Sequence, residues 1–161
     1  MDCQVGDDTL QFLARQYNHT FYDYYSGKDE GSRRYLLDIN PWARDRVRGD
    51  GNNIIDGRWI DTQNGMFVDI TGISEAFPDT EPGVWVCKNE HRYRVKDIFP
   101  LRETMFESVV AKVPYEYVAI LEEEYSRFAL TRTAYEGHRW DPAAKVWVRD
   151  PSAAEESIEV M

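Results

Sequence analysis

Two acids in one short segment are the residues of this sequence best suited to chemistry. Residues 57–71 read GRWIDTQNGMFVDIT, so Asp61 and Asp69 each stand among large apolar residues. A carboxylate with apolar neighbours is costly to desolvate unless a cation or a hydrogen-bond donor stabilises its charge. A divalent metal or a basic side chain could supply that stabilisation, so metal binding and ion pairing are the candidate roles.

The hairpin expected in this segment separates the two acids. Asn-Gly at 64–65 favours a two-residue type I′ turn, because both residues tolerate positive φ. That turn places Ile60 opposite Asp69 and makes Arg58 a diagonal neighbour of Asp69 on the same face. Asp61 falls on the other face, so the two acids cannot form one site together.

Asp69 has two interpretations from its place in the middle of a strand. An acid on the face opposite a buried face can project rigidly into a cleft as a metal ligand. Alternatively, Asp69 forms an ion pair with Arg58 on a solvated face of the sheet, worth about 0 to 1 kcal/mol if exposed. Asp61 lies beside the turn, where we expect it to be solvated or to support the turn.

A second group of charges surrounds the segment 98–101, which contains Pro100. Lys96 and Arg102 flank this proline-restricted segment and could clamp a phosphate, with an ordinary solvated loop as the alternative. The common mechanistic signatures are absent: there is no P-loop, GxSxG, HExxH or GxGxxG, and the three histidines lack metal-ligand spacing. Cys3 and Cys87 either form a disulfide or remain free thiols.

Composition limits the classes of function. The chain has 161 residues, 42% of them hydrophobic, which fits one ordinary domain with a core. Its net charge of -10 repels polyphosphate backbones and argues against nonspecific nucleic-acid binding. A compact phosphate-bearing substrate would need a divalent metal between the acids and the phosphate.

Sequence signals for cellular location point to two different compartments. No run approaches the roughly 20 apolar residues of a membrane span, and the acidic start MDCQVGDD has no signal-peptide h-region. These features alone predict a soluble, cytoplasmic chain. The sequon Asn18-His19-Thr20, in contrast, matters only in the secretory pathway.

The elements that must position these residues predict an α+β domain. Asp7 and Asp8 offer N-caps for a helix with Leu10, Leu13 and Tyr17 on one face. Period-two patterns and turn residues predict strands at 34–40 and 84–86 and hairpins at 58–71 and 104–113. The alignment of Val118, Leu121 and Tyr125 predicts a helix after Pro114, and the polar tail at 150–161 is expected to be frayed.

Three segments carry a resemblance to a known family. They are GRWIDTQNGMFVDIT (57–71), KDIFPLRETMFESVVAKVPYEYVAILEEEY (96–125) and EGHRWDP (136–142). Together they resemble the LicD family, in particular its fungal members related to fukutin and fukutin-related protein. The resemblance implies a domain over 1–149 with a partial, polymerase-β-like nucleotidyltransferase fold. In that fold a mixed sheet with hairpins is flanked by helices, and here the N-terminal strand and the donor loop would be missing.

The family resemblance also implies a chemistry. A DxD pair and a third acid hold divalent metal against the phosphates of a nucleotide-activated donor, and a phosphorylated group (phosphocholine, ribitol phosphate or mannose phosphate) moves onto a glycan. By resemblance, Asp69 is the third acid and Asp2, in MDCQV, is the second acid of the pair. These two residues would bind Mg²⁺ or Mn²⁺, and we expect Arg58, Lys96 and Arg102 to bind the phosphates.

The resemblance leaves two function classes open. The first acid of the pair and the Gly-rich donor loop are missing from the sequence, so we expect a truncated enzyme domain that is inactive alone. Its partners would be a nucleotide-activated donor and a glycan acceptor in the Golgi, held there by an anchor that this sequence does not contain. The alternative is a noncatalytic domain that binds a glycan or a protein through its aromatic face.

Overall fold

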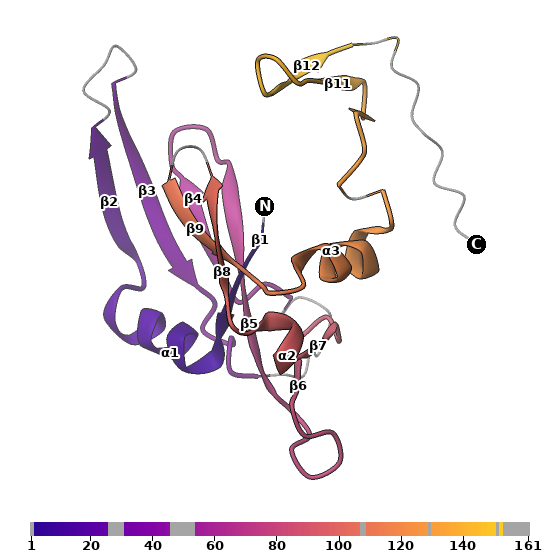
Figure 1. Cartoon of the computed structure of the whole chain (residues 1–161). Helices are drawn as coiled ribbons and strands as arrows, with labels where there is room; N and C mark the ends of the chain where they lie inside the picture. Colours follow the sequence, from indigo (N-terminus) through magenta and orange to yellow (C-terminus); the bar gives the residue numbers. More distant parts are fainter. Residues whose placement is uncertain are drawn as a thin grey trace. The chain divides into compact units, whose positions relative to one another are not determined.

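The protein divides into two compact units, described here from a computed structural model. Unit 1 comprises Met1–Pro100 and unit 2 comprises Leu101–Met161 (Figure 1). Strands predominate and the helices are short, so the predicted α+β class is confirmed in its broad form. The described residues are 2–25, 31–45, 54–106, 109–128, 130–150 and 152.

Unit 1 is a mixed sheet with a helix packed on one face. Its strands follow the order β2-β3-β4-β5-β6-β7 in antiparallel pairs, and β1 joins β5 in parallel. The elements are β1 (Asp2–Gly6), α1 (Asp7–Gln16), β2 (Thr20–Tyr25), β3 (Ser32–Ile39), β4 (Gly57–Asp61), β5 (Phe67–Glu75), β6 (Val84–Val86), β7 (Arg92–Arg94) and α2 (Val95–Ile98).

The core lies between α1 and the sheet. Leu10 of α1 is fully buried against Leu37, Ile39 and Ile70 of the strands, and Leu13 packs at its margin. The predicted apolar face of the helix is therefore confirmed at Leu10 and Leu13. The prediction of aspartate N-caps is wrong, because Gly6 is the N-cap and both aspartates lie in the first turn, where they complement the helix dipole.

The hairpin between β4 and β5 differs from the predicted register. Arg58 pairs directly with Asp69, and residues 62–65 form the loop, with Gly65 at φ 76°. The two-residue turn is wrong because polar side chains favour a longer loop. Asp61 Oδ1 accepts a hydrogen bond from the Gln63 amide (2.9 Å), and the Asn64 side chain accepts one from the Met66 amide. The pairing shifts by an even number of positions, so the predicted faces are preserved.

Unit 2 contains the second predicted hairpin and a sheet that the pattern did not indicate. The hairpin at 104–113 is confirmed as β8 (Arg102–Phe106) paired with β9 (Val109–Val113). The helix α3 (Tyr117–Tyr125) begins later than the predicted start after Pro114. A three-stranded sheet follows, and the predicted tail at 150–161 lies almost wholly outside the described residues. The strands of that sheet are β10 (Ala134–Tyr135), β11 (His138–Asp141) and β12 (Val146–Arg149).

Candidate metal and phosphate site

The parallel pairing of β1 with β5 brings together the two acids that the resemblance singles out. Asp2 and Asp69 are Cα partners at the start of this ladder. Neighbouring strands lie about 4.8 Å apart, so the two positions are next to each other on one face of the sheet. Carboxylate oxygens are the ligands that Mg²⁺ and Mn²⁺ prefer, and two acids at paired positions fit that preference.

Gly72 lets helix α1 close on β5 and so supports this pairing. A Cβ atom at Gly72 would lie 2.7 Å from Asp7 Oδ1 and 2.9 Å from Leu10 Cδ2. Val5 is the register partner of Gly72, and Gln4 of the same strand donates a hydrogen bond to the Tyr93 hydroxyl at 2.8 Å. The register of the two acids therefore rests on a close approach of helix and strand.

Asp69 forms an ion pair with Arg58 in the described structure. Arg58 Nε lies 2.8 Å from Asp69 Oδ1, and the guanidinium carbon lies 4.3 Å from the centre of the Phe67 ring. The Asp69 side chain is 21% exposed and that of Arg58 is 42% exposed. The ion-pair interpretation of Asp69 is thus confirmed, while its role as a metal ligand stays a prediction.

The pairing continues across the sheet as a charge row. Arg58 is the register partner of Asp38 on β3, and His19 Nε2 lies 3.1 Å from Asp38 Oδ1. We define the charge row as the positions Asp2, Asp69, Arg58, Asp38 and His19. It runs over four strands and the turn before β2, with two adjacent acids at Asp2 and Asp69, and Arg58 lies between the acidic positions Asp69 and Asp38.

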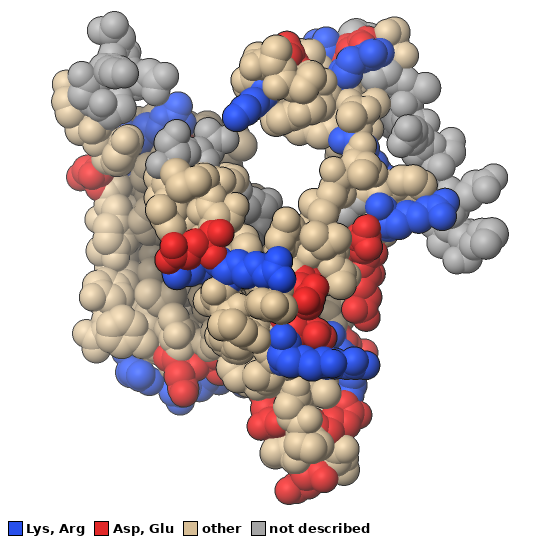
Figure 2. All heavy atoms as spheres, viewed as in Figure 1, with Lys and Arg blue, Asp and Glu red and all other residues tan. Residues whose placement is uncertain are grey.

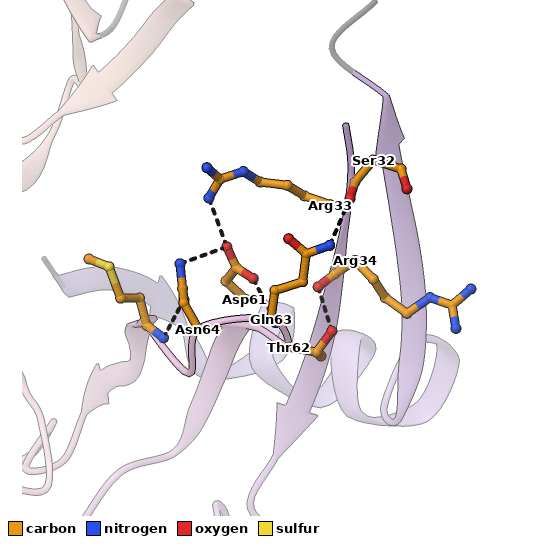
Figure 3. A network of polar contacts seen from close by, with 8 residues as sticks. Ser32, Arg33, Arg34, Asp61, Thr62, Gln63 and Asn64 are labelled. Atoms are coloured by element: carbon orange, nitrogen blue, oxygen red, sulfur yellow. Dashed lines mark hydrogen bonds and ion pairs between the residues drawn. The ribbon is translucent and has the colours of Figure 1, made fainter. Parts of the chain in front are cut away.

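Asp61 supports its turn from the opposite face (Figure 3). Its side chain is buried. The carboxylate accepts hydrogen bonds from the Gln63 backbone amide, from the Arg33 guanidinium at 3.0 Å and from the Asn64 side chain at 3.2 Å. The Gln63 amide and then the Arg33 guanidinium hold the pKa of the Asp61 carboxyl below its usual value. The turn-supporting expectation is confirmed, and the expectation of a solvated acid is wrong because Arg33 and the turn cover it.

The two other candidate phosphate ligands are not joined to this site by described contacts. Lys96 is exposed on α2, and no hydrogen bond or ion pair among the described residues links it to Arg58 or Asp69. Arg102 belongs to unit 2, where its guanidinium carbon lies 4.1 Å from the Tyr115 ring centre. Their roles as phosphate ligands stay predictions.

A buried ion pair in unit 1 had no counterpart in the sequence pattern. Asp56 Oδ1 lies 2.7 Å from Lys88 Nζ, and the two side chains are 0% and 1% exposed. Asp56 Oδ2 accepts a hydrogen bond from the Gly72 amide at 2.8 Å, and Lys88 donates one to the Trp42 carbonyl at 3.1 Å. The pair thus joins three loops to β5, close to Asp69 along that strand.

The remaining described polar groups give less support for a binding site. Cys3 and Cys87 are both free thiols, so the disulfide alternative is not realised. Across the described side chains, no group of three or more His, Cys, Asp and Glu could hold a metal ion. Acidic side chains gather at the lower tip of the view in Figure 2, which is the loop between β5 and β6 in Figure 1. No helix in the described ranges is long and apolar enough to cross a membrane.

Two proteins of Saccharomyces cerevisiae are similar to part of this chain. Mannosyltransferase regulator 4 is 34% identical over 73 residues, and Mannosyltransferase regulator 14 is 36% identical over 73 residues. In each case the aligned segment makes up 45% of this chain, but only 6% and 8%, respectively, of those proteins. No protein-family model and no solved structure matches the chain. The similarity therefore relates part of the chain to short segments of two yeast mannosyltransferase regulators.

Proposed function

We propose that this chain is a LicD-like domain of a glycan phosphotransferase with a nucleotidyltransferase-type fold. Asp2 and Asp69 would hold Mg²⁺ or Mn²⁺ against the diphosphate of a nucleotide-activated donor, and a phosphorylated group would pass to a glycan. The observation that carries the proposal is the parallel β1–β5 pairing, which makes these two acids register partners. A shared metal requires its ligands to lie close together, and residues 67 positions apart in the sequence have no local reason to meet.

The described side chains support donor binding rather than a complete reaction. A bound divalent ion would neutralise the charge on the donor phosphates. Asp69 is fixed on a central strand by its contact with Arg58, and Arg58 brings a guanidinium suited to phosphate within reach of the same carboxylate. Asp2 and Asp69 are two of the three carboxylates expected for this chemistry, so we propose that they bind the metal and, through it, the phosphates of the donor.

The similarity to the two yeast proteins favours one of the three phosphorylated groups that the family resemblance implies. Both relatives are named as regulators of a mannosyltransferase. We therefore propose mannose phosphate as the transferred group, a mannose-containing glycan as the acceptor and the Golgi lumen as the location. Phosphocholine and ribitol phosphate are the other groups that the family resemblance implies.

Thermal melting with metal and nucleotide tests the proposal. We expect Mn²⁺ together with a nucleoside diphosphate to raise the melting temperature of the wild type, and Asp69→Asn to abolish that rise. Asp23→Asn is the matched control, because Asp23 pairs with Arg34 at 2.7 Å on the same sheet face, away from the charge row. An unchanged wild-type melting temperature, or the same rise in Asp69→Asn, would refute the proposal.

A noncatalytic binding function is the second candidate, and exposed aromatic residues favour it. Phe21, Tyr24 and Tyr25 of the terminal strand β2 are 56%, 60% and 75% exposed. Amphipathic aromatic side chains of this kind are typical of binding surfaces. This candidate predicts that Tyr25→Ala weakens binding to a mannose oligosaccharide, while metal and nucleotide leave the melting temperature unchanged.

A further inference from the structure

Arg58 already supplies a cation to the acid that the proposed function assigns to a metal. Its Nε atom lies 2.8 Å from Asp69 Oδ1, so this carboxylate oxygen is engaged by a guanidinium before any metal binds. A divalent ion that uses Asp69 must therefore compete with Arg58 or accept a positive charge beside it. Because the Arg58 side chain is 42% exposed, solvent is available to it when it leaves the carboxylate.

Arg58 also has contacts that do not depend on Asp69. Its guanidinium lies over the Phe67 ring at 4.3 Å, a cation–π contact that holds the group near the sheet. On its other side, the register partner is Asp38, whose carboxylate contacts His19. The guanidinium is thus retained at the site while its hydrogen bond to Asp69 is exchanged.

We propose that Arg58 is a positioning residue that occupies Asp69 until a metal–diphosphate complex arrives. The guanidinium then exchanges the Asp69 carboxylate for a phosphate oxygen, and Asp69 turns to the metal. A bare divalent ion offers Arg58 no such new partner, so Arg58 makes the site selective for metal bound to diphosphate over metal alone. This inference rests on the proposed function and adds to it the regulation of metal binding.

The same sheet face carries a near copy of the arrangement that serves as a control. Arg34 contacts Asp23 through Nε at 2.7 Å and through a terminal nitrogen at 3.1 Å, and its guanidinium lies 5.7 Å from the Phe21 ring centre. This pair lies on β2 and β3, outside the charge row. Arg34→Met therefore removes the same charge and the same kind of contacts from the same sheet without touching Asp69.

Titrations of the whole chain with Mn²⁺ alone and with Mn²⁺ plus inorganic pyrophosphate test the exchange, with bound Mn²⁺ followed by electron paramagnetic resonance. We expect Arg58→Met to bind Mn²⁺ alone about fivefold more tightly than the wild type, the scale of one partly exposed ion pair. We expect it to bind Mn²⁺-pyrophosphate about fivefold more weakly, because one charge-assisted phosphate contact is lost. Arg34→Met stays within about twofold of the wild type in both titrations, since a charge beyond the Debye length is largely screened.

The opposite signs distinguish exchange from a structural role. If Arg58→Met weakens both titrations or changes neither, the exchange is refuted, while loss of Mn²⁺ binding in Asp69→Asn would still support the proposed function. If Asp69→Asn binds Mn²⁺ like the wild type, or if neither the wild type nor Arg58→Met binds it, both proposals fail. Should Arg58→Met prove unfolded by circular dichroism, Arg58→Gln keeps a polar donor without the charge and is expected to give the same two signs.

Discussion

The buried pair of Asp56 and Lys88 gives the sharpest stability prediction, and Lys88→Met is the change that tests it. The substitution keeps an unbranched side chain, but the Asp56 carboxylate, which is 0% exposed, loses the Lys88 ammonium and keeps its hydrogen bond from the Gly72 amide. Removing one partner of a buried ion pair destabilises a protein by about 3 to 5 kcal/mol. We expect a loss of that size in the free energy of unfolding, measured by urea denaturation with tryptophan fluorescence.

A double variant checks the reasoning behind that number. Asp56→Leu combined with Lys88→Met removes both charges; it also removes the acceptor of the Gly72 amide and the Lys88 donor of the Trp42 carbonyl, losses worth about 1 to 3 kcal/mol. The double variant is therefore expected to be more stable than Lys88→Met alone. Lys96→Met is the matched control, because Lys96 is exposed in the same unit, and it should stay within about 0.5 kcal/mol of the wild type.

Two results would contradict this account of the pair. A loss below about 1 kcal/mol for Lys88→Met would mean that Asp56 finds water or another donor and does not need the ammonium. A double variant less stable than Lys88→Met would mean that the Asp56 side chain stabilises the fold through contacts other than the ion pair.

Three further substitutions, and Thr20→Ala as the control for one of them, test contacts that support the sheet and its turn. Gly72→Ala should cost about 1 to 3 kcal/mol by overpacking, since its Cβ would lie 2.7 Å from a carboxylate oxygen, and urea denaturation measures it. Asn18→Ala removes the side-chain oxygen that accepts a hydrogen bond from the Ile39 amide at 2.7 Å, so the free energy of unfolding should fall by about 1 to 3 kcal/mol. Thr20→Ala removes the same sequon, but it should lower the free energy of unfolding by less than about 1 kcal/mol. The pKa of Asp61 is lowered in the folded state. Its contribution to the free energy of unfolding is therefore present above the pKa of the unfolded chain, about 4, and is lost as the pH falls through the pKa of the folded state. The stability difference between the wild type and Asp61→Asn, measured by urea denaturation at pH 7 and pH 3, should therefore narrow at the lower pH.

The sequence predicted the elements that local patterns specify. The strand at 84–86 appears as β6, and the second hairpin appears as β8 and β9, two short runs with apolar residues that two polar residues separate in the sequence. The strands β10 to β12 were missed because they have only two to four residues each, too few for a period-two pattern to be recognised. The Asp56–Lys88 pair was missed because its two residues are distant in sequence, and no periodicity marks a charge that folding will bury.

The error in the first hairpin explains which part of the site could be foreseen. Side chains alternate with a period of two, so a pairing error of an even number of positions moves partners along the strand but leaves each side chain on its face. Asp69 and Arg58 were therefore correctly placed together and Asp61 correctly apart. Their distance was not foreseeable, because it depends on how the Asn64 and Asp61 side chains set the loop length. In the proposed function that distance matters, because a directly paired Arg58 occupies the Asp69 carboxylate and a metal that uses Asp69 would have to displace it.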